Sequence, residues 1–337
     1  SNKTRFFPFN KGNDGGAGNP PSDGFRTDYL WTDILSKDSL SDIIANFINY
    51  QEIDDEYGKP TGEKKIIFPR FHQLDAVRKL VVVSRSGPGR SYLIQHSAGS
   101  GKSNTISWLG YRLASLHDQN NRNVYDSVVV VTDRKILDRQ LQKTFQQFES
   151  VSGVLSSIDK SSAQLKEALE KGRKVIVTTL QKFPRIVEQI KELPGKNFAV
   201  IIDEAHSSTT GENSKNMKLV LTANGLEDAE ESDTEEETYE DLIIRDLEAR
   251  GKQKNVSYYA FTATPKAKTL ELFGQKLPDG HYEPFHLYTM RQAIEEGFIL
   301  DVLKNYMTYK TYFSLLKKVE DDPRYESAKA RLPAMHT

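Results

Sequence analysis

Cysteine is absent from this chain of 337 residues. Disulfide bonds and thiolate metal sites are therefore excluded, and the fold must depend on an apolar core and on hydrogen bonds. A chain of this length can bury enough apolar surface for one large domain or two small ones. The lack of cysteine suits a reducing compartment.

Long apolar runs are also missing, and none approaches the roughly 20 residues that cross a bilayer. The chain begins with Ser1 and Asn2 rather than Met, and it shows no charged-then-apolar leader. We therefore expect neither a membrane anchor nor a secretory signal, and we expect a cytoplasmic location.

Net charge is nearly absent, at −1, but it is unevenly distributed. Residues 227–241 contain ten acidic residues and no Lys or Arg, and the rest of the chain has 46 basic residues against 37 acidic ones. A block of like charges is usually a solvated surface insertion. The alternative is a segment that mimics nucleic acid or docks a partner. The basic excess elsewhere leaves a nucleic-acid partner open.

The chain divides by composition into three parts. Residues 1–60 begin with a Gly-, Asn- and Pro-rich loop and continue, over 28–50, with apolar residues at helical spacing. We expect linker helices there. Residues 61–290 contain the patterns of a globular domain, with the acidic insertion inside it. Residues 291–337 are expected to connect to a further domain.

Within the central part, short runs rich in Val and Ile alternate with amphipathic segments. The runs cover 91–96, 127–133, 174–179, 199–205 and 257–263, and helical patterns cover 103–117, 135–148 and 162–171. Continuous apolar strands joined by helices are typical of a mostly parallel sheet with helices on both faces. Each run ends in a polar cluster, so five clusters should meet at the carboxyl edge of one sheet, where ligands of such folds bind.

The segment His96–Ser103, HSAGSGKS, has the strongest chemical signature. It matches the phosphate-binding loop (P-loop) pattern of Gly, four residues, Gly-Lys-Ser/Thr, except that His96 replaces the first Gly. Backbone N–H groups of such a loop and of the helix that follows bind phosphate oxygens. Lys102 is predicted to reach the phosphates of ATP, and Ser103 to bind Mg²⁺. The predicted nucleotide contacts here are Ala98, Gly99, Ser100, Gly101, Lys102, Ser103 and Asn104.

Two further clusters are predicted to complete a hydrolytic site. Asp203 follows a buried strand and could hold Mg²⁺ through water, while the next residue, Glu204, could activate the attacking water. His206 could sense the γ-phosphate. Thr262 and Thr264 follow another strand, and their hydroxyls could couple the acidic pair to the rest of the protein. The predicted catalytic residues are thus Lys102, Asp203, Glu204 and His206.

Taken in order, the segments GSGKS, TDR, TTLQK, DEAH and TATP resemble the motifs of superfamily 2 helicases and translocases, whose motor lobes have a RecA-like fold. The segment FPRFHQ resembles the Q motif of that superfamily. This resemblance implies that Gln73 reads the adenine edge and that Arg70 lies beside it.

A closer resemblance covers nearly the whole chain. The opening residues and the segments FPRFHQLDAVRKLV, VTDRKILDRQL, VTTLQKF and MRQAIEEGFILDVLKNY are similar to the R (restriction and translocation) subunits of type I restriction enzymes. The resemblance implies the linker and the first RecA-like motor lobe, without the nuclease domain or the second lobe. It also implies double-stranded DNA and the methylation and specificity subunits as partners, and ATP with Mg²⁺ as cofactors.

The same resemblance implies a DNA-binding role for the residues that match motifs Ia and Ib. Hydroxyl, amide and basic groups that touch phosphates would give binding that depends on salt but not on sequence, as translocation requires. These residues are Thr132, Arg134, Lys135, Thr178, Thr179, Gln181 and Lys182.

Two other functions share these motifs, namely a strand-separating DNA or RNA helicase and a P-loop domain that acts only as a nucleotide-controlled switch. Glu204 argues against the switch, because a switch has little use for a carboxylate that activates water. His281 and His286 do not favour a metal site, because no third ligand lies at a suitable spacing. We expect a structural role for both histidines.

Overall fold

The computed structural model of the protein describes residues 8–55, 60–132, 155–157, 167–179, 186, 189–190, 193, 195–203, 247 and 253–301. Among the helices of these residues, none combines the length and the apolar character that crossing a bilayer requires.

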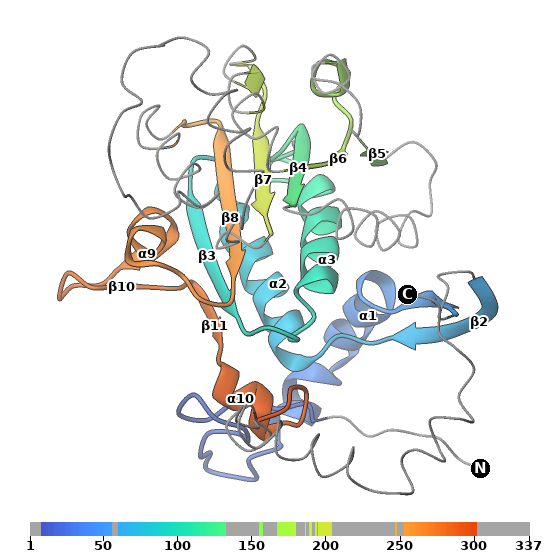
Figure 1. Ribbon diagram of the computed structural model, residues 1–337, viewed down its shortest axis with the longest axis vertical. Coiled ribbons are helices and arrows are strands. Elements are labelled where there is room, and N and C mark those ends of the chain that lie inside the picture. The colour runs from blue at the N-terminus through green and yellow to red at the C-terminus, as the bar shows by residue number, and fades with distance from the viewer. Residues whose placement is uncertain are drawn as a thin grey trace, which may run out of the picture.

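A sheet of seven parallel strands forms the centre of the described fold (Figure 1). Its order is β11-β3-β8-β7-β4-β6-β5, and every neighbouring pair is parallel. The sheet confirms the predicted α/β class, and all five predicted strands are present within one or a few residues. Their bounds and those of the two added strands are β3 (Ser91–His96), β4 (Ser127–Thr132), β5 (Leu155–Ser157), β6 (Val175–Thr179), β7 (Phe198–Ile202), β8 (Val256–Thr262) and β11 (His286–Tyr288).

Alternate residues of each central strand enter one of two apolar cores, one on each face of the sheet. In β4, for example, Val128 and Val130 belong to one core, whereas Val129 and Val131 belong to the other. All six residues of β4 are buried, because helices cover the sheet from both sides. This burial on both faces explains why the strands are continuously apolar in sequence.

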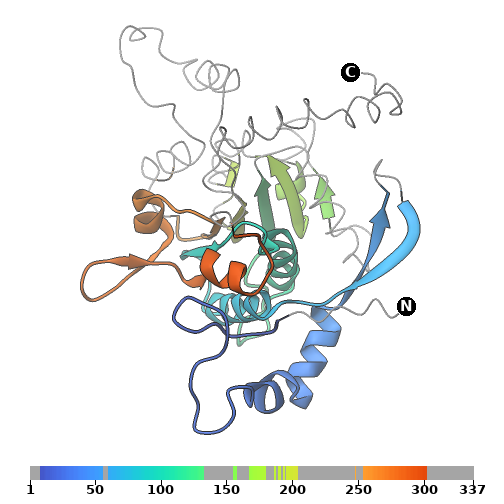
Figure 2. The same ribbon diagram turned by 60° about the horizontal axis from the view of Figure 1, so that its bottom comes forward.

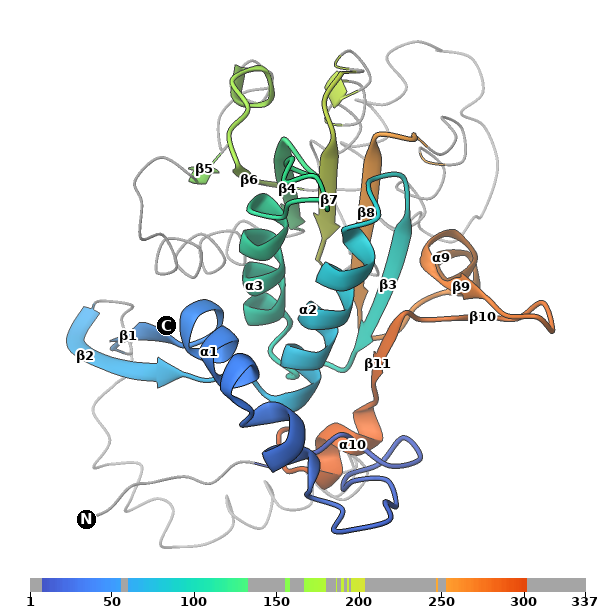
Figure 3. The same cartoon turned by 180° about the vertical axis from the view of Figure 1, so that it is seen from behind.

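Helices α2 (Phe71–Ser84) and α3 (Lys102–Ala114) lie side by side across one face of the sheet (Figure 3). Leu74, Val77 and Leu109 are fully or almost fully buried in the core on this face. On the opposite face, α9 (Ala267–Phe273) buries Phe273 in the second core. The predicted two-sided helical cover is therefore confirmed.

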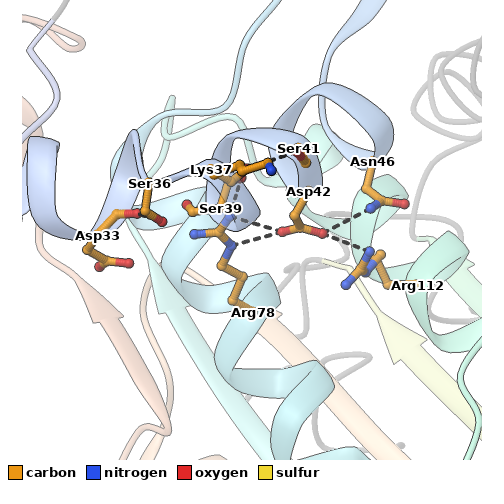
Figure 4. Close-up of polar contacts among 9 residues, drawn as sticks. All are labelled: Asp33, Ser36, Lys37, Ser39, Ser41, Asp42, Asn46, Arg78 and Arg112. Atoms are coloured by element: carbon orange, nitrogen blue, oxygen red, sulfur yellow. Dashed lines mark hydrogen bonds and ion pairs between the residues drawn. The ribbon is translucent and has the colours of Figure 1, made fainter.

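The N-terminal segment packs onto the helices of the first face. A short π-helix, η1 (Leu30–Ile34), precedes α1 (Lys37–Asn46), in agreement with the helices expected over 28–50. Asp42 of α1 binds Arg78 of α2 and Arg112 of α3, each at 3.0 Å (Figure 4). Just after α1, the carbonyl oxygen of Phe47 accepts a hydrogen bond of 3.0 Å from Trp108 Nε1 of α3. Helix α1 is thus attached to both helices that flank the P-loop.

Two parts of the fold differ from what the sequence indicated. The edge strand β11 at 286–288, which the helix α10 (Met290–Glu295) follows, was not among the expected strands. The hairpin of β1 (Asn49–Asp54) and β2 (Pro60–Ile67) was not expected at all. Its strands are polar and largely exposed, so they lack the apolar runs that marked the buried strands. The small hairpin of β9 (Gln275–Lys276) and β10 (Tyr282–Glu283) precedes β11.

Residues near the two ends of the described chain lie side by side. Figure 2 shows α10 next to the N-terminal loop. The backbone N–H of Ala17 donates to Glu295 of α10 at 2.7 Å, and the Thr289 hydroxyl donates to the carbonyl oxygen of Gly15. The Gly-rich N-terminal loop is therefore held by contact with α10 and by hydrogen bonds within the loop, such as that from Gly12 N–H to the carbonyl oxygen of Gly18 at 2.9 Å.

Candidate nucleotide site

The P-loop lies between β3 and α3, as its sequence predicts. Gly101 adopts a left-handed conformation with φ of 81°, and α3 begins at the next residue, Lys102. A Cβ atom at Gly101 would lie 2.6 Å from Gln73 Nε2, and one at Gly99, whose φ is 70°, would lie 2.6 Å from Ile299. Both glycines of the loop are thus required by backbone conformation and by close neighbours.

Three side chains from the start of α2 bind the carbonyl oxygens of this loop. Arg70 donates from Nη1 to Gly99 O at 3.2 Å. His72 Nε2 lies 3.0 Å from Ser100 O. Gln73 Nε2 donates to Ser100 O at 3.3 Å and to Gly101 O at 3.0 Å. Three successive carbonyl groups of the loop are therefore held by one helix end.

His72 takes part in this arrangement as a neutral side chain. Burial lowers its pKa to about 3, and the hydrogen bond with the Ser100 carbonyl only partly opposes this shift. The neutral ring donates its single hydrogen from Nε2 to the carbonyl oxygen. Its face stacks on Tyr288, with ring centres 3.7 Å apart and planes 15° from parallel.

The loop also fits an anionic ligand by its polar groups. The backbone N–H of Ser97 donates to the carbonyl oxygen of Tyr288 at 3.0 Å, and that of Ser100 donates to the carbonyl oxygen of Ser97 at 3.3 Å. Other backbone N–H groups of the loop, such as those of Gly99 and Gly101, would therefore bind the phosphate oxygens. The hydroxyls of Ser97 and Ser100 are buried and have no hydrogen-bond partner in the structure. Buried hydroxyls are normally satisfied, so these two indicate a place for a polar ligand. The residues present therefore fit a bound nucleotide triphosphate.

Gln73 has a different role in the structure from the one that the resemblance implied. Its amide nitrogen binds the loop, and its Oε1 accepts the Arg70 backbone N–H at 2.8 Å. Reading an adenine edge would use the remaining capacity of Oε1 or require the amide to turn. Adenine recognition by Gln73 stays a prediction, whereas its attachment to the P-loop is observed.

The carboxyl edge of the sheet brings the other predicted residues toward the loop. The pairing registers align Gln95 of β3 with Thr262 of β8, and Ile202 of β7 with Ala260 of β8. Asp203 therefore follows β7 at the level where β8 approaches Thr262. Since neighbouring strands lie about 4.8 Å apart, β7 is about 10 Å from the P-loop strand β3.

Asp203 and Lys102 are both buried, with exposed fractions of 3% and 8%. The backbone N–H of Asp203 donates to the carbonyl oxygen of Val131 at 2.9 Å, which extends the sheet by one residue and fixes the side chain at its edge. Thr262 is buried, and its hydroxyl accepts the backbone N–H of the exposed Thr264 at 3.3 Å. Ser103 and Asn104 are partly exposed in the first turn of α3.

The residues expected to bind DNA separate into buried, partly exposed and undescribed ones. Thr132 and Thr178 are fully buried, in contrast to the surface position that a direct contact with DNA needs. The reason is the two-sided cover of the sheet, which buries the strand up to its last residues. Thr179 at the end of β6 is partly exposed. Outside the described residues lie Arg134, Lys135, Gln181, Lys182, Glu204, His206 and the acidic insertion at 227–241.

One group of side chains behind the P-loop was not found from the sequence as a unit. His286 of β11 lies between His96, at 2.8 Å, and Asp75 of α2, at 3.1 Å. His286 was expected to be structural, which its burial supports, but its partners lie 190 and 211 residues away in the chain. The only signal in the sequence was His96 in place of the first Gly of the motif.

Several known proteins are similar to this chain in sequence. A family model described as SWI2/SNF2 ATPase matches residues 72–226. The chain is 28% identical over 289 residues to the type I restriction enzyme HindI endonuclease subunit of Haemophilus influenzae, a match covering 81% of the chain and 24% of that subunit. It is 24% identical to the EcoKI endonuclease subunit of Escherichia coli K12, over 69% of the chain and 17% of that subunit.

Among solved structures, the UvsW helicase of bacteriophage T4 matches 71% of the chain and 66% of its own length, with 17% identity and a TM-score of 0.39. Scores of this size do not bear on function. The curated relatives, in contrast, confirm the resemblance seen in the motifs, although the chain spans only about a quarter of the first of them. The chain is therefore a relative of the type I restriction enzyme endonuclease (R) subunits and carries their helicase-like SWI2/SNF2 ATPase region.

Proposed function

We propose that this chain binds ATP with Mg²⁺ at the P-loop and, within the complete subunit, hydrolyses it to move along double-stranded DNA. The observation that carries the proposal is the P-loop itself, whose carbonyl oxygens are held by Arg70, His72 and Gln73. Membership of an ATPase family supports the use of ATP.

Residues at and next to this edge of the sheet would supply the groups that ATP hydrolysis needs. Lys102, at the first position of α3, would place its ammonium group on the phosphates. Ser103 and Asp203 would hold Mg²⁺, the serine directly and the carboxylate through water. The bound ion would neutralise phosphate charge. Glu204 would orient and deprotonate the attacking water, since it follows Asp203 directly.

Coupling to the rest of the protein is proposed for Thr262 and Thr264. β8 lies between the P-loop strand β3 and β7 in the sheet, so the end of β8 is next to the P-loop on one side and to Asp203 on the other. In this structure the Thr262 hydroxyl accepts a hydrogen bond from the backbone N–H of Thr264. The same hydroxyl could instead bind the acidic pair when nucleotide is present. The loop that begins at Thr264 would then move with the state of the nucleotide.

DNA contacts are proposed at the ends of β4 and β6, with Thr179 as the described residue that has an accessible position. Basic residues in the undescribed segments, at 134, 135 and 182, would bind phosphates without reading sequence. We propose methylation and specificity subunits as further partners, because the resemblance to R subunits implies them. We also propose that residues 61–290 form the motor lobe, because every strand of the seven-stranded sheet lies within that range.

A strand-separating helicase would share every residue of this site, and a nucleotide-controlled switch would share all but the need for Glu204. The experiment that separates them uses the complete subunit assembled with its partner subunits. We expect ATP-dependent displacement of a triplex-forming strand from duplex DNA, without separation of the duplex. Duplex unwinding would favour the helicase. Unchanged ATP turnover in Glu204→Gln would favour the switch.

A further inference from the structure

The residue that departs from the P-loop pattern, His96, is the last residue of β3 and is completely buried. Its Nε2 lies 2.8 Å from Nδ1 of His286, whereas its own Nδ1 is buried without a hydrogen-bond partner. A buried N–H group without an acceptor is rarer and more costly than a bare lone pair. His96 therefore carries its hydrogen on Nε2 and donates it to His286.

This assignment fixes the direction of the remaining bonds. Burial, together with the nearby His286, holds the pKa of His96 well below its usual value, so its ring is neutral. His286 accepts at Nδ1 and consequently donates from Nε2 to Asp75, at 3.1 Å. Asp75 also binds Lys79 at 2.6 Å. Burial alone would raise the pKa of Asp75, but the bonds from His286 and Lys79 outweigh it and keep the carboxyl ionised.

The chain of three side chains joins three elements that meet at the P-loop. His96 is the residue just before the loop, His286 is on β11, and Asp75 is on α2, which also carries the side chains that bind the loop carbonyls. Two residues beyond His286, the carbonyl oxygen of Tyr288 accepts the backbone N–H of Ser97 at 3.0 Å. The start of the loop is thus held by β11, and its residues 99–101 are held by α2.

The segment after β11 continues this contact around the outside of the loop. The guanidinium carbon of Arg70 lies 3.6 Å from the centre of the Phe298 ring, and Ile299 lies against Gly99. The hydroxyl of Tyr288, whose ring stacks on His72, donates to Glu296 of the same segment at 2.7 Å. Tyr288, Phe298 and Ile299 thus contact the loop or a side chain that binds it.

We propose that His286 is a positioning residue for nucleotide binding, which it assists by accepting a hydrogen bond from His96 and so fixing the start of the P-loop. The proposal rests on the proposed function, since it assumes that the loop binds ATP. It also gives His96 a role. At the position where the usual pattern has glycine, the His96 ring binds His286 of β11. His286 itself does not touch the nucleotide.

Two conservative variants separate the two bonds of His286. In His286→Asn the side-chain oxygen occupies the position of Nδ1 and can still accept from His96. In His286→Gln the amide nitrogen occupies the position of Nε2 and can still donate to Asp75, but the acceptor for His96 is lost. His286→Leu removes both, and His281→Asn is a matched control because His281 is exposed.

The affinity of the full chain for a fluorescent ATP analogue with Mg²⁺ is measured beside urea unfolding without nucleotide. We expect His286→Asn and the control to bind within about twofold of the unaltered protein, and His286→Gln to bind about tenfold more weakly, as loss of one buried hydrogen bond predicts. Hydrogen exchange at residues 97–101 should be faster only in the Gln and Leu variants.

Equal affinity of the Asn and Gln variants would overturn the positioning role, as would a loss of affinity that only follows the loss of stability. If His286→Leu does not fold, the comparison of His286→Asn with His286→Gln still tests the proposal. Failure of the unaltered protein to bind the analogue would overturn the proposed function and this proposal together, whereas normal binding by all variants would overturn this proposal alone.

Discussion

Gly101 is the residue at which the P-loop turns into α3, and both its conformation and its surroundings exclude a side chain. Its φ of 81° lies in the left-handed region, and an added Cβ would lie 2.6 Å from Gln73 Nε2. We predict that Gly101→Ala loses ATP binding and destabilises the fold by about 1–2 kcal/mol, the typical cost of a left-handed residue with a side chain. Titration with a fluorescent ATP analogue and urea unfolding measure the two effects.

Gly172→Ala is the matched control for this prediction. Gly172 also has a positive φ, of 65°, but an added Cβ there would meet no atom within 4 Å. The control should show a similar loss of stability and unchanged ATP binding. Unchanged ATP binding in Gly101→Ala as well would show that the contact with Gln73 does not shape the site.

The neutral His72 makes stability depend on pH. Its folded pKa of about 3 is below the usual 6.5, so between these values the unfolded chain binds the proton and the folded chain does not. The contribution of the neutral His72 to the free energy of unfolding is therefore fully present above pH 6.5, and it is lost as the pH falls below this value. We predict a loss of about 1.4 kcal/mol from this residue between pH 7.5 and 5.5, measured by urea unfolding.

His96 adds to the same loss, since its pKa is also lowered by burial. The variant His72→Gln, which keeps a donor for Ser100, should therefore show a smaller difference between the two pH values than the unaltered protein, though not zero. An identical pH dependence in both proteins would mean that His72 is not neutral in the fold.

At this scale, the sequence was sufficient for residues whose role is local. Lys102, Ser103 and the glycines follow from a motif because the loop and the helix are contiguous. The partners of His96 were beyond reach, because His286 lies 190 residues away and meets it only through the order of the strands. The burial of Thr132 and Thr178 also depends on the cover over the strand ends, and a local sequence pattern does not predict that cover.

Among the elements, α1 meets both helices that flank the P-loop, α2 and α3, at the carboxylate of Asp42. Asp42 accepts from Arg78 Nε at 3.1 Å, from Arg112 at 3.0 Å and from Asn46 at 2.9 Å (Figure 4). Arg78 also donates to the carbonyl oxygen of Ser39 at 3.0 Å. The three charged side chains are about one quarter exposed, so their interactions are only partly screened by solvent.

We predict that Asp42→Ala lowers the free energy of unfolding by about 1–2 kcal/mol, because it leaves two largely buried guanidinium groups without their carboxylate. The midpoint of urea unfolding measures the effect. Asp38→Ala, on the exposed side of the same helix, should change stability by less than about 0.5 kcal/mol. Equal effects of the two variants would mean that the ion pairs do not attach α1.

The elements that could be predicted from the sequence are those buried on both faces. β3, β4 and β8 appear as apolar runs because helices cover both sides of the sheet. The hairpin β1–β2 escaped prediction because most of its described residues are exposed, and β11 because a strand of three residues is too short to show a period. Edge and surface strands are specified by their partners rather than by their own composition.

For the whole molecule, the class of fold and the family followed from the order of the motifs along the chain. The parallel sheet then places the ends of β3, β8 and β7 at one edge, so that residues far apart in sequence share one site. What the order of motifs did not show is how β11 and the segment after it hold the P-loop from behind.

The central claim is that Lys102, Ser103 and Asp203 converge on one Mg–ATP. The most direct test is calorimetric titration of the full chain with a non-hydrolysable ATP analogue, with and without Mg²⁺, for the unaltered protein, Lys102→Ala and Asp203→Asn. We predict one binding site, at least tenfold weaker binding in Lys102→Ala, and loss of the Mg²⁺ dependence in Asp203→Asn. The same affinity and the same Mg²⁺ dependence in all three proteins would contradict the account.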